Sequence, residues 1–93
     1  MSWLDTKPQD VVTDAVAQLA SATGANADSI RSYADGDLRF GLWIHLVDKR
    51  CVTVLGVGIF DLEDWHWRNA YDSGSSPKDA FADFREEMGY GED

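Results

Sequence analysis

The stretch of sequence that decides the fold is Asp37-Leu38-Arg39-Phe40-Gly41-Leu42-Trp43-Ile44-His45-Leu46-Val47. Every second residue from Leu38 to Leu46 is apolar. Successive side chains of a strand point to opposite faces, so this alternation predicts a β-strand over Asp37–Val47. One face of the strand would be fully apolar, and the other would carry Arg39, Trp43 and His45.

The flanking residues predict a small antiparallel sheet. After a turn at Asp48-Lys49, residues 50–59 are β-branched and largely apolar on both faces, as in a central strand. The Asp35-Gly36 pair is a short-range hairpin signal. We therefore expect residues 29–34 to form a further strand, with a helical turn as the alternative, and the sheet to have two or three strands.

Helices are predicted at both ends of the chain. Apolar residues recur at helical spacing after Thr6-Lys7-Pro8-Gln9, which predicts a helix over about 7–23. Asp61 can cap a second helix that runs to about Asp72. Ser76-Pro77 opens a third, which Gly89 ends. The short Gly-Ser loop between the last two predicts a helical hairpin.

These elements predict one α+β domain over residues 1–93. It would hold an N-terminal helix, the small antiparallel sheet and the C-terminal helical hairpin, with the helices on the Leu38–Leu46 face. We expect residues 1–6 and 89–93 to be flexible.

Composition limits the function classes. The chain has 17 acidic and 8 basic residues, a net charge of −9, which argues against direct nucleic-acid binding. Its single cysteine excludes an internal disulfide and fits a reducing compartment. No signal segment or long apolar run is present, so we expect a soluble cytoplasmic protein that does not bind membranes.

The last third of the chain interleaves aromatic and acidic residues. Residues 60–93 carry seven of the eleven aromatics, and ten acidic against three basic residues. Rigid aromatic side chains on an acidic surface suit a basic or nucleic-acid-binding protein partner. The predicted anchors are Trp65, Trp67 and Tyr71. The predicted charge contacts are Asp61, Glu63, Asp64, Asp72, Asp79, Asp83, Glu86 and Glu87.

The direction of the tryptophan rings is left open by the sequence. On a helix, Trp65 and Trp67 would lie about 200° apart, so one ring would face solvent or be covered by the third helix. Arg39, Trp43 and His45 would form a secondary exposed patch if the helices cover only the apolar face of the sheet. Alternatively, Trp43 packs over Gly56 or Gly58.

No residue pattern indicates a reaction, a metal or a cofactor. His45 and Cys51 lack a third orienting group, and His66 beside Asp64 reads as a solvated surface histidine. The histidines and the cysteine do not match a zinc spacing. The run Gly56-Val57-Gly58 has an acid where a dinucleotide site needs its third glycine. We therefore predict a non-enzymatic protein without metal or cofactor.

The run Asp64–Tyr71, followed by Gly74 and Ser76–Ala80, resembles the ends of small, uncharacterised acidic accessory proteins of high-GC bacteria and their phages. The resemblance covers about a quarter of the chain. It implies an accessory or phage-encoded protein that acts by binding.

Three functional hypotheses follow. The first is an acidic protein-binding module that inhibits or modulates its partner, with a DNA mimic as the sharpest form. The second is a self-assembling homo-oligomer, joined through the 29–34 edge or the Trp43 patch. The third is a small enzyme that uses His45 or His66. The acidity itself could also reflect solubility or salt adaptation.

Overall fold

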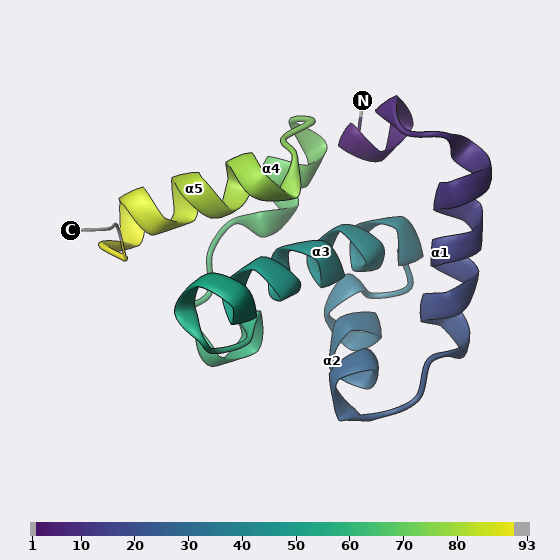
Figure 1. Cartoon of the computed structure of the whole chain (residues 1–93), viewed down its shortest axis with the longest axis horizontal. Coiled ribbons are helices and arrows are strands. Elements are labelled where there is room, and N and C mark those ends of the chain that lie inside the picture. The colour runs from purple at the N-terminus through teal and green to yellow at the C-terminus, as the bar shows by residue number, and fades with distance from the viewer. Residues whose placement is uncertain (1, 91–93) are drawn as a thin grey trace.

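The computed structural model describes residues 2–90, and within them it contains helices and no strand. The elements are the 3-10 helix η1 (Trp3–Thr6), α1 (Gln9–Ser21), α2 (Ala25–Ala34), α3 (Leu38–Leu55), the 3-10 helix η2 (Ile59–Asp61), α4 (Trp67–Asp72) and α5 (Pro77–Met88). Helix α3 crosses the middle, with α1 and α2 at one end and α4 and α5 along its other side (Figure 1). The predicted α+β fold with an antiparallel sheet is therefore wrong.

The predicted strand Asp37–Val47 lies in α3. All five residues from Phe40 to Ile44 are buried, because other elements pack around this helix. A helix buried all round shows no polar stripe, so its sequence loses the 3.6-residue period that identifies an amphipathic helix. The Asp37 carboxylate accepts a hydrogen bond from the Phe40 N–H at 3.1 Å, and Gly56 ends the helix with φ 79°. These are a helix cap and a helix stop.

Asp48, predicted to form a turn, lies inside α3 and ties three elements together. It is buried, and its carboxylate accepts hydrogen bonds from the Ile59 N–H at 2.8 Å and from Asn26 Nδ2 at 3.3 Å. A Cβ atom at Gly58 would lie 3.0 Å from Asp48 Oδ1, so glycine permits this close approach. Asp48 thus holds η2 and α2 against α3.

The Asp35-Gly36 turn is confirmed in position, but it joins two helices. Asp35 has φ 54° and Gly36 has φ 88°, the left-handed conformation that such turns require. Residues 29–34 belong to α2, so the strand is wrong and the helical alternative is correct. At Gly41, a Cβ atom would lie 3.2 Å from Leu19 Cδ2. Glycine there lets α1 approach α3 closely.

The helices predicted at the two ends are confirmed in part. The first is two residues shorter at each end, as Gln9–Ser21. The third is confirmed: the Ser76 hydroxyl accepts from the Asp79 N–H at 3.0 Å, and Gly89 ends α5 with φ 81°. The second is confirmed only in its last part, because α4 covers Trp67–Asp72 but residues 62–66 before it are not helical.

The chain ends were predicted to be flexible. Within the first six residues, η1 is closed by a capping box between Ser2 and Asp5, and Leu4 is buried. At the other end, Tyr90 stacks on Phe84 with ring centroids 5.5 Å apart. Residues 1 and 91–93 lie outside the described residues.

The core is centred on Trp43, whose side chain has 0% of its surface exposed. Its indole N–H donates to the Ser75 carbonyl at 3.0 Å. Its ring stacks on Phe40 at 6.2 Å and meets Trp67 and Tyr71 edge to face, at 6.4 and 5.7 Å. Trp43 therefore joins α3 to α4 and to the loop before α5.

We expect Asp48→Ala to lower the free energy of unfolding by about 1–3 kcal/mol, because it leaves the buried Ile59 N–H without its acceptor. Asp48→Asn keeps an acceptor oxygen and should cost less. Urea denaturation measures both, with the exposed neighbour Lys49→Ala as the control, which should stay within about 0.5 kcal/mol of wild type. If the Asp48→Ala protein were as stable as that control, the conclusion that Asp48 holds η2 and α2 against α3 would be wrong.

Candidate functional site

The three predicted aromatic anchors lie in the core. Trp65, Trp67 and Tyr71 are all buried. Residues 62–66 are not helical, so the two tryptophans are not on opposite helix faces, and their ring centroids are 4.6 Å apart. Both rings pack on Phe84 of α5, at 5.9 and 5.0 Å. The solvent-facing alternative is wrong, and the third predicted helix does cover these rings.

The secondary patch is not formed either. Trp43 is fully buried, and it packs on aromatic rings rather than over Gly56 or Gly58. Arg39 pairs with the Asp5 carboxylate at 2.7 Å. His45 lines a separate cavity between α1, α2 and α3 whose other lining residues carry no ionisable side chain. The structure does not bring these three residues together as an exposed surface.

All eight predicted acidic contacts are exposed, and some already have partners. Asp72 pairs with Arg68 at 3.3 Å, and Glu63 accepts from the Tyr90 hydroxyl at 3.0 Å, which raises the pKa of Tyr90. Glu87 Oε1 lies 3.5 Å from His66 Nε2 and 3.3 Å from the Trp65 indole nitrogen. These carboxylates therefore already interact with side chains of the same chain.

Three acids on α5 remain without an ion-pair partner among residues 2–90: Asp79, Asp83 and Glu86. Spacings of four and three residues place them on one exposed helix face. Like charges at these spacings destabilise a helix by about 0.2–0.5 kcal/mol per pair. This face of α5 therefore carries concentrated negative charge at a cost to the helix. We call it the α5 acidic face.

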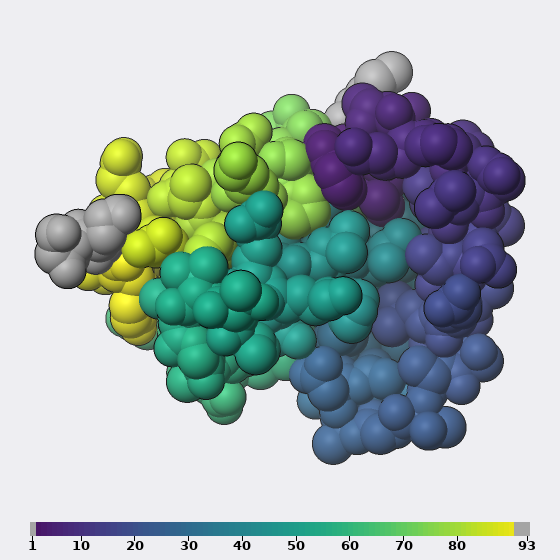
Figure 2. Space-filling model, in the orientation of Figure 1, coloured from purple at the N-terminus to yellow at the C-terminus, as the bar shows by residue number. Residues whose placement is uncertain are grey.

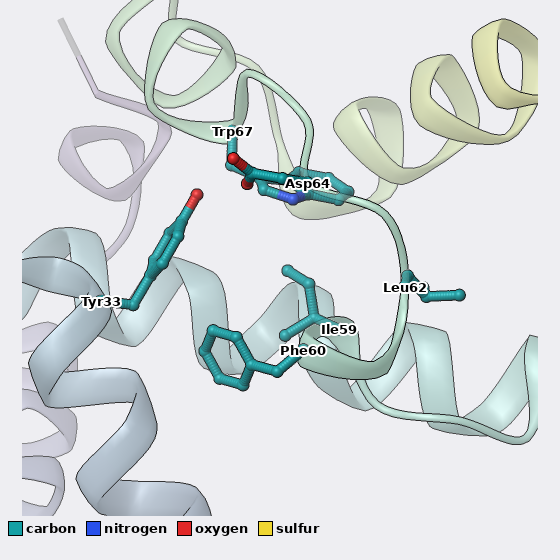
Figure 3. A pocket seen from close by; sticks show the side chains of 6 residues that line it. All are labelled: Tyr33, Ile59, Phe60, Leu62, Asp64 and Trp67. Carbon is teal, nitrogen blue, oxygen red and sulfur yellow. The ribbon is translucent and has the colours of Figure 1, made fainter.

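A small pocket opens between α2 and the segment that leads into α4 (Figure 3). Its volume is about 160 Å³. Its lining residues are Tyr33, Ile59, Phe60, Leu62, Asp64 and Trp67. Tyr33 comes from α2, Ile59 and Phe60 from η2, and Trp67 from the first turn of α4. We call it the Tyr33 pocket.

The Tyr33 pocket combines exposed aromatic rings with one carboxylate. Phe60 is 41% exposed and Tyr33 is 37% exposed, and their rings meet edge to face with centroids 5.6 Å apart. The hydroxyl end of Tyr33 points toward the Asp64 carboxylate (Figure 3). Burial, and secondarily the negative charge of Asp64, raise the pKa of the Tyr33 hydroxyl. The pocket can therefore receive a group with an apolar or flat surface and a positive charge.

Only Asp64 and Trp67 of this pocket were among the predicted site residues. Tyr33 and Phe60 were missed, because they are far apart in sequence and meet only when α2 and η2 both pack on α3. A local signal existed in Phe60-Asp61, a large aromatic next to an acid at the start of the acidic third. Nothing in the sequence marks Tyr33.

The residues considered for catalysis are placed apart. Cys51 is buried in α3, and burial, together with the nearby charge of Asp48, raises the pKa of its thiol to about 12. Such a thiol is not ionised near neutral pH and is a poor nucleophile. His66 is exposed and contacts Glu87 only weakly, at 3.5 Å. Among residues 2–90, no three His, Cys, Asp or Glu side chains could together hold a metal ion.

Comparison with known protein families, curated proteins and solved structures found no match for this chain. The resemblance to acidic accessory proteins therefore stays a prediction. In the part of the chain that the structure describes, no helix has both the length and the apolar composition to cross a bilayer.

The Cys51 thiol predicts a pH dependence of stability. The unfolded thiol ionises near 9.0 while the folded one stays protonated to about 12, so the unfolded state binds fewer protons between these values. The free energy of unfolding should therefore fall as pH rises through this range. We expect wild type to lose more stability than Cys51→Ala between about pH 8 and pH 11 in urea denaturation.

The matched control for that measurement is alkylation by iodoacetamide. Cys51 should react slowly in the native protein and readily in urea, because the folded thiol is buried. Rapid alkylation of the native protein, or identical pH profiles of wild type and Cys51→Ala, would contradict this account of the thiol.

Proposed function

We propose that this chain is a non-enzymatic acidic protein-binding module. It contacts a basic or nucleic-acid-binding protein through carboxylates of its C-terminal part, and in doing so inhibits or modulates that protein. The single observation that supports the proposal most is the α5 acidic face, whose three carboxylates have no ion-pair partner within residues 2–90.

The distribution of ion pairs favours a binding role of the acidic residues over a role in solubility alone. Arg31, Arg39 and Arg68 each pair with a carboxylate outside the α5 acidic face. A surface evolved only for solubility would intersperse both signs of charge. Concentrated charge of one sign instead accelerates encounter with an oppositely charged partner and selects against other partners.

The sharpest form of the proposal is a mimic of the DNA phosphates. In that form, the carboxylates occupy the phosphate-binding surface of a nucleic-acid-binding protein. Duplex DNA would then compete with the chain for its partner. If DNA did not affect binding of the partner, the result would support only the broader proposal of an acidic protein-binding module.

We expect the triple variant Asp79→Asn, Asp83→Asn, Glu86→Gln to bind the partner about tenfold more weakly at low salt. Each exposed charge contact contributes about 0.2–1 kcal/mol, and about 1.4 kcal/mol corresponds to a factor of ten. Partners are captured from a lysate of the source organism, identified by mass spectrometry, and then titrated as purified proteins at low and high salt. Binding should weaken as salt screens the charges.

The control variant removes the same number of charges elsewhere: Asp10→Asn, Asp14→Asn and Asp35→Asn, all exposed and outside the C-terminal part. It should bind like wild type. Equal weakening by both triple variants would show that only net charge matters. An unchanged affinity of the α5 variant, or a partner held equally at all salt concentrations, would contradict the proposal.

A second candidate function, a self-assembling subunit, is supported by exposed valines. Val52, Val54 and Val57 are exposed around the C-terminal end of α3, a region that lies on the face shown in Figure 2. The two surfaces predicted for self-assembly are not available, because residues 29–34 are helical rather than an edge strand and Trp43 is buried.

The two candidates differ in the expected oligomeric state. The acidic module should be a monomer at high protein concentration and low salt, because a net charge of −9 opposes self-association. Size-exclusion chromatography with light scattering measures this. A dimer at low salt, lost in Val54→Ser but kept in the exposed-residue control Thr53→Ser, would favour the self-assembling subunit.

A further inference from the structure

The size of the Tyr33 pocket excludes most small-molecule ligands. Sites for metabolites or drug-sized molecules occupy about 300–1,000 Å³. The Tyr33 pocket has about 160 Å³ and opens to solvent. It is therefore large enough for one side chain of a partner protein, but not for a whole metabolite or cofactor.

The chemistry of the pocket favours a cation with a flat face. Asp64 supplies the one carboxylate among the described lining residues, and no basic side chain of residues 2–90 lies in that lining to neutralise it. The exposed rings of Tyr33 and Phe60 flank the opening from α2 and η2 (Figure 3). Aromatic faces attract cations, and a planar guanidinium stacks on them better than a strongly hydrated ammonium does.

Trp67 adds a hydrogen-bond donor that has no acceptor of its own. No hydrogen bond within residues 2–90 uses its indole N–H, although every fully buried side-chain nitrogen and oxygen there has a partner. That nitrogen therefore reaches solvent. Only 2% of the Trp67 side chain is exposed and the residue lines the pocket, so the pocket is where the N–H is accessible. A ligand that carries a carbonyl could accept from it.

The same chain already holds a guanidinium in this manner elsewhere. The Arg68 side chain lies over the Phe40 ring at 4.9 Å and over the Tyr71 ring at 5.4 Å, and it pairs with the Asp37 carboxylate at 3.0 Å. There, two rings and an acid surround an arginine. The Tyr33 pocket presents the same combination of two rings and an acid, and its lining holds no basic side chain from residues 2–90.

We infer that the Tyr33 pocket binds an arginine side chain of the protein partner, with its guanidinium on the Tyr33 and Phe60 rings and paired with the Asp64 carboxylate. The indole N–H of Trp67 donates to a backbone carbonyl of the same arginine. The inference rests on the proposed function for the basic nature of the partner. It adds the residue type that is recognised and the place where it binds.

The test uses N-acetyl-arginine amide as the probe, because it carries the guanidinium and two carbonyls without the rest of a partner. We expect saturable ¹H–¹⁵N shifts of the Trp67 indole and of the Tyr33, Phe60 and Asp64 amides. Asp64→Asn should weaken binding about tenfold, through loss of a charge-assisted hydrogen bond. Phe60→Leu should weaken it severalfold through loss of the aromatic face.

The matched control is Glu63→Gln, which removes the same charge from the neighbouring residue, lies outside the pocket lining and keeps an acceptor for the Tyr90 hydroxyl. It should leave probe binding unchanged. N-acetyl-citrulline amide, the neutral analogue with the same shape, should bind at least about tenfold more weakly, since it lacks the charge.

Four results would overturn the inference: no saturable shift, equal binding of the citrulline probe, tighter binding of N-acetyl-lysine amide, or shifts spread over α5 that Asp64→Asn does not alter. The last would leave the α5 acidic face intact as a binding surface. Conversely, arginine binding in the pocket without any basic partner in the salt-dependent titrations would remove the proposed function and keep the pocket. The two failures are therefore distinguishable.

Discussion

The rest of the structure depends on the burial of the first half of α3, where all residues from Phe40 to Ile44 are buried. Helices α1, α2, α4 and α5 and the 3-10 helix η2 all pack against it. In a domain of this size, a single central helix is an efficient way to bury apolar surface, because each surrounding helix needs only one apolar face. The cost is that α3 has almost no polar face in its first half, and that its one buried charge, Asp48, must be fully hydrogen-bonded.

That same constraint explains why sequence reasoning failed for the fold. Residues 38–46 lie in the part of α3 that other elements cover, so apolar residues occur on more than one face of the helix. Over so short a stretch, the apolar pattern of a buried helix cannot be distinguished from the alternation of a strand. Local signals were more reliable. The Ser76 cap, the Gly89 stop and the Asp35-Gly36 turn were predicted correctly, since each rests on hydrogen bonds or dihedral angles of neighbouring residues. Whether those turns join strands or helices depends on contacts with distant residues.

For the candidate site as well, local properties were predictable from the sequence and long-range contacts were not. The exposure of the acidic residues was predictable, because charged side chains are almost never buried without partners. The direction of the aromatic rings was not. Trp65 and Trp67 turn inward because residues 62–66 are not helical and α5 covers the two rings. Tyr33 and Phe60 remain exposed because they lie at the outer edge, where α2 and η2 meet over α3.

The tie made by Asp48 links the central helix to the Tyr33 pocket. Its hydrogen bond to the Ile59 N–H fixes the start of η2, and Phe60 is the next residue. A ring held by a tied 3-10 turn loses little conformational freedom when a ligand stacks on it, so binding there costs less entropy than binding to a mobile loop. The α5 acidic face and the Tyr33 pocket then serve different physical ends. Exposed charges on α5 would act on a partner at a distance and would be screened by salt, whereas the proposed arginine contact in the pocket would act only at short range, through the Asp64 carboxylate and the aromatic faces. A partner that used both would be attracted by its net charge and selected by the placement of one arginine.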